Sequence, residues 1–213
     1  MTVDVSEPGL RERKRRATER AIQVAVLELV GDKGLDRVTV DEISRSADVS
    51  PRTFFNYFSS KESALVGEGP VLPDDEAVQE FAHAGPGADL FDGLRALLVA
   101  AAELSTQDVD LTMKRRRILG EYPQLFAMRM ATVHQFENQL EGVVARRLVL
   151  DHPERGKDPA ALARDSRLIV LVTMAALRHA SGLWLTSDPH RPLGELVAES
   201  FASLRTVLTT SAH

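Results

Sequence analysis

Closely spaced helix starts between residues 39 and 62 constrain this chain more than any other feature. Thr39 and Glu42 have the spacing of a capping box, in which each side chain bonds the backbone N–H of the other and starts a helix. Ser50-Pro51 is an N-cap followed by proline in the first helical position, where no N–H is needed. Ser59-Ser60-Lys61-Glu62 repeats the capping-box spacing. We therefore expect short helices over about 40–47, 51–58 and 60–66.

A longer amphipathic helix precedes them, from Leu10 to about Gly34, with a strongly basic first half. Residues 9–20 hold six Lys and Arg against two Glu, although the whole chain has a formal charge of −5. Residues 1–62 carry 11 basic and 11 acidic side chains, whereas residues 63–213 carry 15 and 20. This asymmetry favours a basic end that contacts phosphate, and a solvated helix start is the alternative.

The helices expected over 40–47 and 51–58 have the dimensions of a helix-turn-helix motif. At 100° per residue, Phe54 and Phe58 of the second helix face the core, whereas Arg52, Phe55 and Asn56 face away. Arginine can pair with guanine, asparagine with adenine, and an exposed ring can contact a thymine methyl group. The pattern indicates a DNA-reading helix, and the alternative is a three-helix core with polar surface residues.

Further candidate contacts lie around this helix. Hydroxyls of Thr53 and Tyr57 at its flanks can reach phosphates or base edges. Thr39 opens the preceding helix, and Lys61 lies at a helix N-terminus, where free N–H groups favour anions. We expect these groups and the basic first helix to bind phosphate.

The remainder of the chain predicts only helices, over about 75–82, 89–104, 109–120, 123–148, 159–185 and 193–208. Breakers at Gly67–Pro73 and Ala84–Gly87 mark a connecting segment. The chain has no cysteine, no secretory signal and no apolar run that could span a bilayer, so we expect no membrane and a cytoplasmic location, on the nucleoid when bound to DNA. The predicted domains are a disordered tail (1–9), a helix-turn-helix domain (10–66), a connecting segment (67–88) and an effector-binding and dimerisation domain (89–213).

Residues 11–66 resemble the DNA-binding region of the TetR/AcrR family of bacterial transcriptional regulators. The matching residues are Gly34-Leu35, Val38-Thr39-Val40-Asp41-Glu42-Ile43, Ala47-Asp48-Val49-Ser50-Pro51-Arg52-Thr53-Phe54-Phe55-Asn56-Tyr57-Phe58, Lys61-Glu62 and Leu65. The resemblance implies an all-α fold, with a three-helix N-terminal helix-turn-helix domain and a C-terminal helical domain that dimerises and binds an effector. The DNA contacts that it implies are Thr39, Arg45, Ser50, Pro51, Arg52, Thr53, Phe55, Asn56, Tyr57 and Lys61.

The chain also resembles an actinobacterial subgroup that includes the mycofactocin-type regulators, some of which have acyl-CoA or lipid effectors. We therefore expect a small hydrophobic or amphipathic effector, lipid-like or acyl-CoA-like. The candidate lining residues are Met113, Arg117, Phe126, Met130, His134 and Glu137. The alternatives are packing in an ordinary core for the apolar residues, a surface or core hydrogen bond for His134 and Glu137, and a solvated helix end for Arg117.

Two stripes in the last two helices predict a homodimer interface over about 159–185 and 193–208. The last helix carries apolar residues at helical spacing: Leu193, Leu196, Val197, Ser200, Phe201, Leu204, Val207 and Leu208. The preceding helix has small residues that allow close approach: Ala175, Ala176, Ala180, Ser181 and Gly182. Both stripes could instead face their own core. A dimer would place two reading helices on the two halves of an inverted-repeat operator in double-stranded DNA.

The function that the sequence predicts is a sequence-specific transcriptional regulator, namely a repressor released from DNA by its ligand. The chain has no G-x-S-x-G, H-E-x-x-H or G-x-x-x-x-G-K-[ST] motif, so we expect no enzyme, no cofactor and no bound metal. One alternative is an all-helical small-molecule-binding protein, or an enzyme without a recognisable catalytic motif. A helical interaction module whose basic arm binds an acidic partner is another.

Overall fold

A computed structural model describes residues 10–186 and 191–210, and all regular structure in these residues is helical, as predicted. The expected tail (1–9) and most of the connection at Ser187–Pro192 lie outside the described residues. The chain forms two compact units. The first unit comprises the residues up to Gly67 together with Asp110–Arg129, and the second unit comprises Glu68–Val109 and the residues from Met130 onward.

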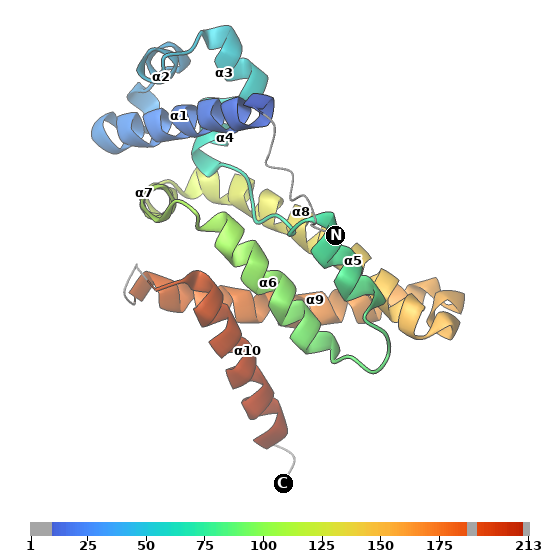
Figure 1. Ribbon diagram of the computed structural model, residues 1–213. Helices are drawn as coiled ribbons and strands as arrows, with labels where there is room; N and C mark the ends of the chain where they lie inside the picture. The colour runs from blue at the N-terminus through green and yellow to red at the C-terminus, as the bar shows by residue number, and fades with distance from the viewer. Residues whose placement is uncertain (1–9, 187–190, 211–213) are drawn as a thin grey trace. The chain divides into compact units, whose positions relative to one another are not determined.

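Four helices follow one another at the start of the first unit (Figure 1): α1 (Leu10–Lys33), α2 (Val40–Ser46), α3 (Pro51–Tyr57) and α4 (Lys61–Val66). A short 3₁₀ helix (Leu35–Arg37) connects α1 to α2. The predicted capping box at Thr39 and Glu42 is present, and Ser50 caps α3. The second box was predicted one residue too early. Ser60 is the N-cap of α4, and it exchanges bonds with Ser63.

A segment from the middle of the chain completes the first unit. It contains α7 (Val109–Glu121) and the start of α8 (Pro123–Asp151). The buried core of this unit takes Leu111, Ile118 and Leu125 from the segment and the rest from α1 to α4. The predicted domain of residues 10–66 therefore does not contain all of its own core.

Two polar side chains, Arg115 and Tyr122, also tie this segment to the residues of α1 to α4 and the connection between α1 and α2. Arg115 Nε donates to the carbonyl of Leu65 at 3.0 Å, and Arg115 Nη2 donates to Gln23 Oε1 at 2.8 Å. The hydroxyl of Tyr122 accepts from the backbone N–H of Leu35 at 3.1 Å. The segment therefore holds α1, the end of α4 and the start of the α1–α2 connection.

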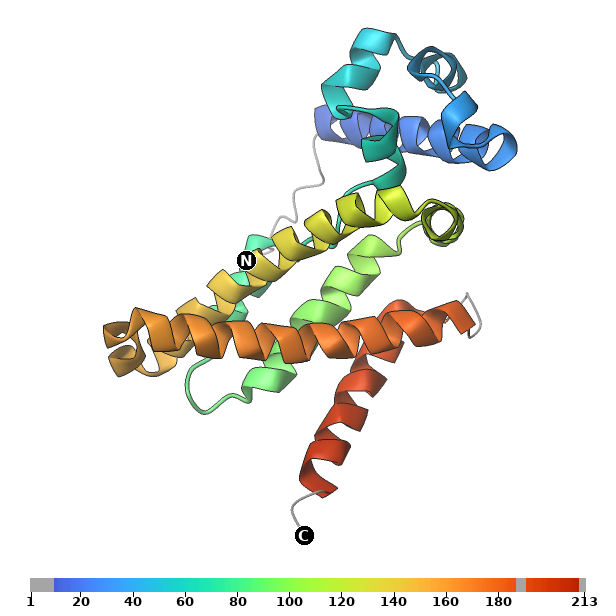
Figure 2. The same cartoon turned by 180° about the vertical axis from the view of Figure 1, so that it is seen from behind.

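The second unit contains α5 (Asp75–His83), α6 (Leu90–Ser105), most of α8, α9 (Pro159–Thr186) and α10 (Leu193–Thr210). A 3₁₀ helix (Pro153–Lys157) joins α8 to α9. In Figure 2, α9 runs along the unit and α10 extends away from its end. The largest buried side chains of this unit include Trp184, Arg147, Phe136, Leu94 and Leu98.

The predicted apolar stripe of α10 is mostly covered within its own chain. Leu193, Leu196, Val197, Ser200 and Phe201 are all buried, and α10 packs against both α9 and α6. This part of the stripe therefore faces the core of its own chain, which was the alternative to a dimer interface. None of the described helices is long and apolar enough to cross a membrane.

Candidate nucleic-acid interface

The turn between α2 and α3 sets the angle at which α3 leaves the core. Ala47 ends α2, and Asp48 has a φ of 53°, a left-handed conformation that aspartate tolerates better than most residues. The N–H of Val49 then bonds the carbonyl of Ser44 at 2.9 Å. Ser50 Oγ accepts from the backbone N–H of Thr53 at 3.0 Å and starts α3. These local bonds fix which face of α3 is presented to solvent.

The exposure of α3 side chains confirms the predicted helical wheel. Phe54 is fully buried and Phe58 is nearly so, whereas Phe55 is 57% exposed and Arg52 and Asn56 lie on the surface. The ring of Phe55 meets the edge of Phe54, with centroids 5.4 Å apart and planes at 88°. We call the outward surface of Arg52, Phe55 and Asn56 the recognition face.

The polar groups of the recognition face are available to a partner. Within the part of the chain that the structure describes, no hydrogen bond or ion pair engages the guanidinium of Arg52 or the amide of Asn56. Both groups can make two parallel hydrogen bonds, Arg52 with the edge of a guanine and Asn56 with that of an adenine. A groove-reading surface needs polar ends of this kind next to an apolar ring.

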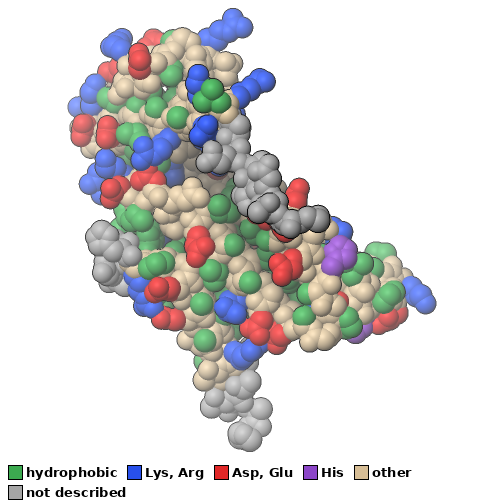
Figure 3. All heavy atoms as spheres, viewed as in Figure 1, with side chains coloured by type: hydrophobic (Ala, Val, Ile, Leu, Met, Phe, Trp, Pro, Cys, Tyr) green, Lys and Arg blue, Asp and Glu red, His purple; other side chains and the backbone are tan. Residues whose placement is uncertain are grey.

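The other predicted DNA-contact residues lie around this face and differ in how they are engaged. Ser50 and Thr53 share a hydroxyl contact of 2.8 Å. Thr39 Oγ1 caps α2 and contacts Glu42 Oε2 at 3.2 Å. Tyr57 is partly buried against the core, whereas Arg45 and Pro51 are exposed on α2 and α3. In the space-filling view, Lys and Arg side chains are spread over the first unit, with acidic side chains among them (Figure 3).

Lys61 has a structural role that the sequence did not reveal. Its Nζ donates to the carbonyls of Leu35 at 2.7 Å and Val38 at 2.9 Å, in the α1–α2 connection. A lysine ammonium has three donors, so one N–H is left for a phosphate. The predicted phosphate contact stays a prediction, and the partners of the Lys61 ammonium in this structure are backbone carbonyls of the α1–α2 connection.

The capping box of α2 also has an electrostatic component. The hydrogen bond from Lys33 to Glu42 Oε1, at 2.9 Å, lowers the pKa of the Glu42 carboxyl, and the backbone N–H of Thr39 lowers it further. The carboxylate form is therefore favoured at the start of α2, where the helix dipole favours a negative charge as well.

Comparison with known proteins agrees with this geometry. The family model of bacterial regulatory proteins of the tetR family matches residues 22–66, which include α2, α3 and α4. The model of the MftR C-terminal domain matches residues 88–209. The chain belongs to the TetR family of bacterial regulatory proteins. The sequence-based resemblance is therefore confirmed.

Two relatives from actinobacteria extend this family assignment. The transcriptional regulator TcmR of Streptomyces glaucescens is 32% identical over 151 residues, which cover 68% of this chain and 66% of TcmR. MftR of Mycobacterium tuberculosis, named for the control of mycofactocin biosynthesis, is 29% identical over 136 residues, which cover 63% of this chain and 68% of MftR. The match to TcmR thus spans just under two thirds of its length. Both relatives are named as regulators, not as enzymes, in agreement with the sequence-based expectation.

A solved structure shows the same fold. NalD of Pseudomonas aeruginosa, the secondary repressor of the MexAB-OprM multidrug efflux pump, superposes with a TM-score of 0.51 at 21% identity. The match covers 88% of this chain and 96% of NalD. This likeness concerns the fold.

The predicted effector-lining residues are divided between the two units. Met113, Arg117 and Phe126 belong to the first unit, and Phe126 is 60% exposed. Met130, His134 and Glu137 belong to the second unit, where Glu137 is buried and bonds His134 at 2.9 Å and Arg167 at 3.6 Å. For Glu137 the structure favours the alternative of a satisfied buried group.

Proposed function

We propose that this TetR-family protein is a repressor that binds an inverted-repeat operator as a homodimer and leaves the DNA when a small apolar or amphipathic effector binds. The recognition face is the observation that carries this proposal. It combines an arginine and an asparagine without partners in the described chain with an aromatic ring that is more than half exposed. A single exposed ring is ordinary on a protein surface, but a ring between two groups that can pair with base edges suits a DNA groove.

A dimer is supported by the exposed apolar face of α9. Leu168 is 62% exposed, Leu171 is 39% exposed and Leu183 is 38% exposed. Ala175 and Gly182 are exposed between them at helical spacing, so two copies of this face can approach closely. Val207 on α10 is 64% exposed and adds to the predicted interface. A two-fold dimer would hold two recognition faces about 34–36 Å apart, one helical turn of DNA.

Release by an effector follows from linkage between the two sites. An effector that binds the DNA-incompetent arrangement more tightly weakens operator binding by the same factor as DNA weakens effector binding. The acyl-CoA-like class expected from the subgroup resemblance belongs in a first ligand screen.

Selection of binding sites from random duplex DNA, with protein refolded after denaturation to remove bound ligand, tests the proposal. We expect the selected DNA to contain an inverted repeat. Light scattering of the protein should give the mass of a dimer. Arg52→Ala should weaken this complex more than a complex with random DNA. If no sequence is enriched at low salt, or if Arg52→Ala weakens both complexes equally, the recognition face does not read the DNA sequence. A monomeric mass at micromolar concentration would contradict the dimer.

A further inference from the structure

A cleft of about 340 Å³ opens between α5 and α6 in the second unit. Half of its lining residues are small: Ala77 on α5, Ala84 directly after α5, Ala88 before α6, and Gly93, Ala96 and Ala100 on α6. Because these side chains are short, the two helices can lie near each other without filling the space between them. The volume is at the lower end of the range of small-molecule sites. None of the effector-lining residues predicted from the sequence lies in it.

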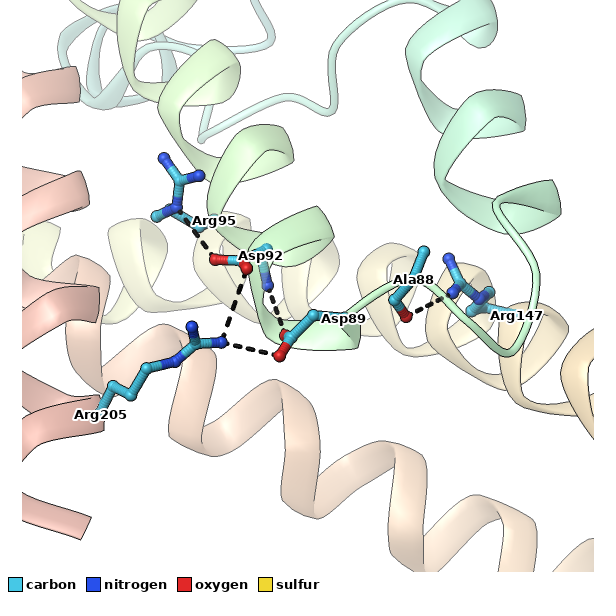
Figure 4. Close-up of polar contacts among 6 residues, drawn as sticks. All are labelled: Ala88, Asp89, Asp92, Arg95, Arg147 and Arg205. Atoms are coloured by element: carbon cyan, nitrogen blue, oxygen red, sulfur yellow. Dashed lines mark hydrogen bonds and ion pairs between the residues drawn. The ribbon is translucent and has the colours of Figure 1, made fainter. Parts of the chain in front are cut away.

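A buried arginine in the lining of the cleft holds the turn between α5 and α6. Arg147 on α8 is 1% exposed and donates to the carbonyls of Phe81 and Gly85, each at 2.6 Å. It also donates to the carbonyl of Ala88 at 3.1 Å (Figure 4). Its Nε bonds the carboxylate of Asp151. Hydrogen bonds from a charged donor are stronger than neutral ones, so the turn between α5 and α6 is fixed. The cleft is therefore a built feature of the unit.

Phe81 forms the apolar floor. Its ring lies against Gly93, where an added Cβ would be 2.7 Å from the ring, so α6 needs glycine at this point. The Arg147 guanidinium lies 5.5 Å from the centroid of the ring. Leu97 is buried beside the floor. A ligand in the cleft thus meets carbon on most of its surface.

The charged groups of the cleft are predominantly acidic. Glu80, Asp89 and Asp92 line it, and Arg147 is the only basic residue among its described lining. The charge of Arg147 is balanced by Asp151, and three of its five N–H groups are directed at backbone carbonyls. An anionic headgroup would gain little from this arginine and would be repelled by any carboxylate of the lining that has no basic partner.

Two of the carboxylates are paired on the side of α6 next to α10. Arg205 Nη2 lies 2.8 Å from Asp89 and 3.6 Å from Asp92, and Arg95 lies 3.6 Å from Asp92 (Figure 4). Neither arginine lines the cleft. The hydrogen bond from the backbone N–H of Asp92 lowers the pKa of Asp89, and the Arg205 charge lowers it further. Glu80, across the cleft on α5, is exposed and has no partner in the described chain.

We infer that the α5–α6 cleft binds a small apolar cation, with its apolar part on the alanines and Phe81 and its positive charge toward Glu80. This inference deepens the proposed function, since it names the class of effector. Only the effect on DNA rests on that function, because binding at the cleft does not require it.

Two matched probes of opposite charge test the inference: dodecyltrimethylammonium and dodecanoate, each below its micelle concentration. Isothermal titration of the full chain should show binding of the cation and at least ten-fold weaker binding of the anion. The preference should shrink as salt is added, because exposed charges are screened. Equal or tighter binding of dodecanoate, or no binding of the cation, would overturn the inference.

Two pairs of variants locate the bound cation. Glu80→Gln should weaken binding of the cation about three-fold, which is the effect of losing one exposed charge pair. Glu76→Gln, on α5 outside the cleft, should leave the affinity unchanged. Ala96→Trp should fill the cleft and weaken binding at least ten-fold, whereas Ala160→Trp, an exposed alanine on α9, should not. Binding that survives Ala96→Trp would place the cation elsewhere and contradict the inference.

Operator binding is then measured separately, with and without the cation. If the cation binds in the cleft but the operator complex persists, the site stands and release by this ligand fails. If the protein binds no operator at all, the proposed function fails while the binding data on the cleft are unaffected.

Discussion

Replacement of Lys61 by methionine separates its structural role from its predicted contact with DNA. Methionine keeps the apolar stem but removes the ammonium that bonds the carbonyls of Leu35 and Val38. A bond from a charged donor contributes about 1.5–3 kcal/mol, and the loss is partly offset by water at this half-buried site. We therefore expect the free energy of unfolding to fall by about 2 kcal/mol for the two bonds together, which is less than the roughly 3–6 kcal/mol that two such bonds would contribute without the compensating water.

Urea denaturation followed by far-UV circular dichroism measures this loss. Lys33→Met is the matched control, because the Lys33 ammonium bonds a single carboxylate near the surface, that of Glu42, and surface ion pairs contribute little to stability. If Lys61→Met and Lys33→Met lower stability equally, the tie between α4 and the α1–α2 connection contributes nothing. DNA binding by Lys61→Met is measured at several salt concentrations. If the slope of log binding constant against log salt concentration becomes shallower by about 0.9 per half-site, the third N–H of Lys61 also contacts phosphate.

Three further changes give distinct results. Arg52→Ala should cost about 1–3 kcal/mol of operator affinity in mobility-shift titrations without changing the urea midpoint, and a shifted midpoint would indicate a structural role. The pKa of Glu42 is lowered in the folded chain, so its contribution to stability is present above the ordinary glutamate pKa and lost as pH falls through the lowered value. In Glu42→Gln, stability should decline less between pH 7 and pH 3 than in the native chain. Arg147→Met leaves Asp151 and three carbonyls without their donor, so we expect a loss of about 3–5 kcal/mol and faster hydrogen exchange at the turn between α5 and α6, and unchanged exchange there would refute the clamp.

The sequence predicted the recognition face because the phase of α3 is set locally. Pro51 and the Ser50 cap fix where the helix starts, and a period of 3.6 residues then decides that Phe54 points inward and Phe55 outward. The start of α4 was harder to place, since two consecutive serines can each serve as N-cap. Glu62 favoured the first serine in the sequence, but Ser63 pairs with the second in the structure.

Features made by distant segments were not visible in the sequence. The partners of Lys61 are backbone carbonyls 26 and 23 residues away, and carbonyls are the same in every residue. The apolar stripe of α10 has the same pattern whether α6 or a second copy of the chain covers it. Alanines such as Ala96 are ordinary helix formers, so only the spacing of α5 and α6 shows that they enclose a cleft.

The interleaved order of the two units affects how such regulators can be recombined. Leu111, Ile118 and Leu125 belong to the core of the DNA-binding unit, yet about forty residues of the other unit separate them from α4 in the chain. A chimaera that joins residues 1–67 to the C-terminal portion of a relative would seat these helices against foreign side chains. Operator specificity is therefore transplanted more safely by exchanging surface residues of α3 than by exchanging the N-terminal segment as a cassette.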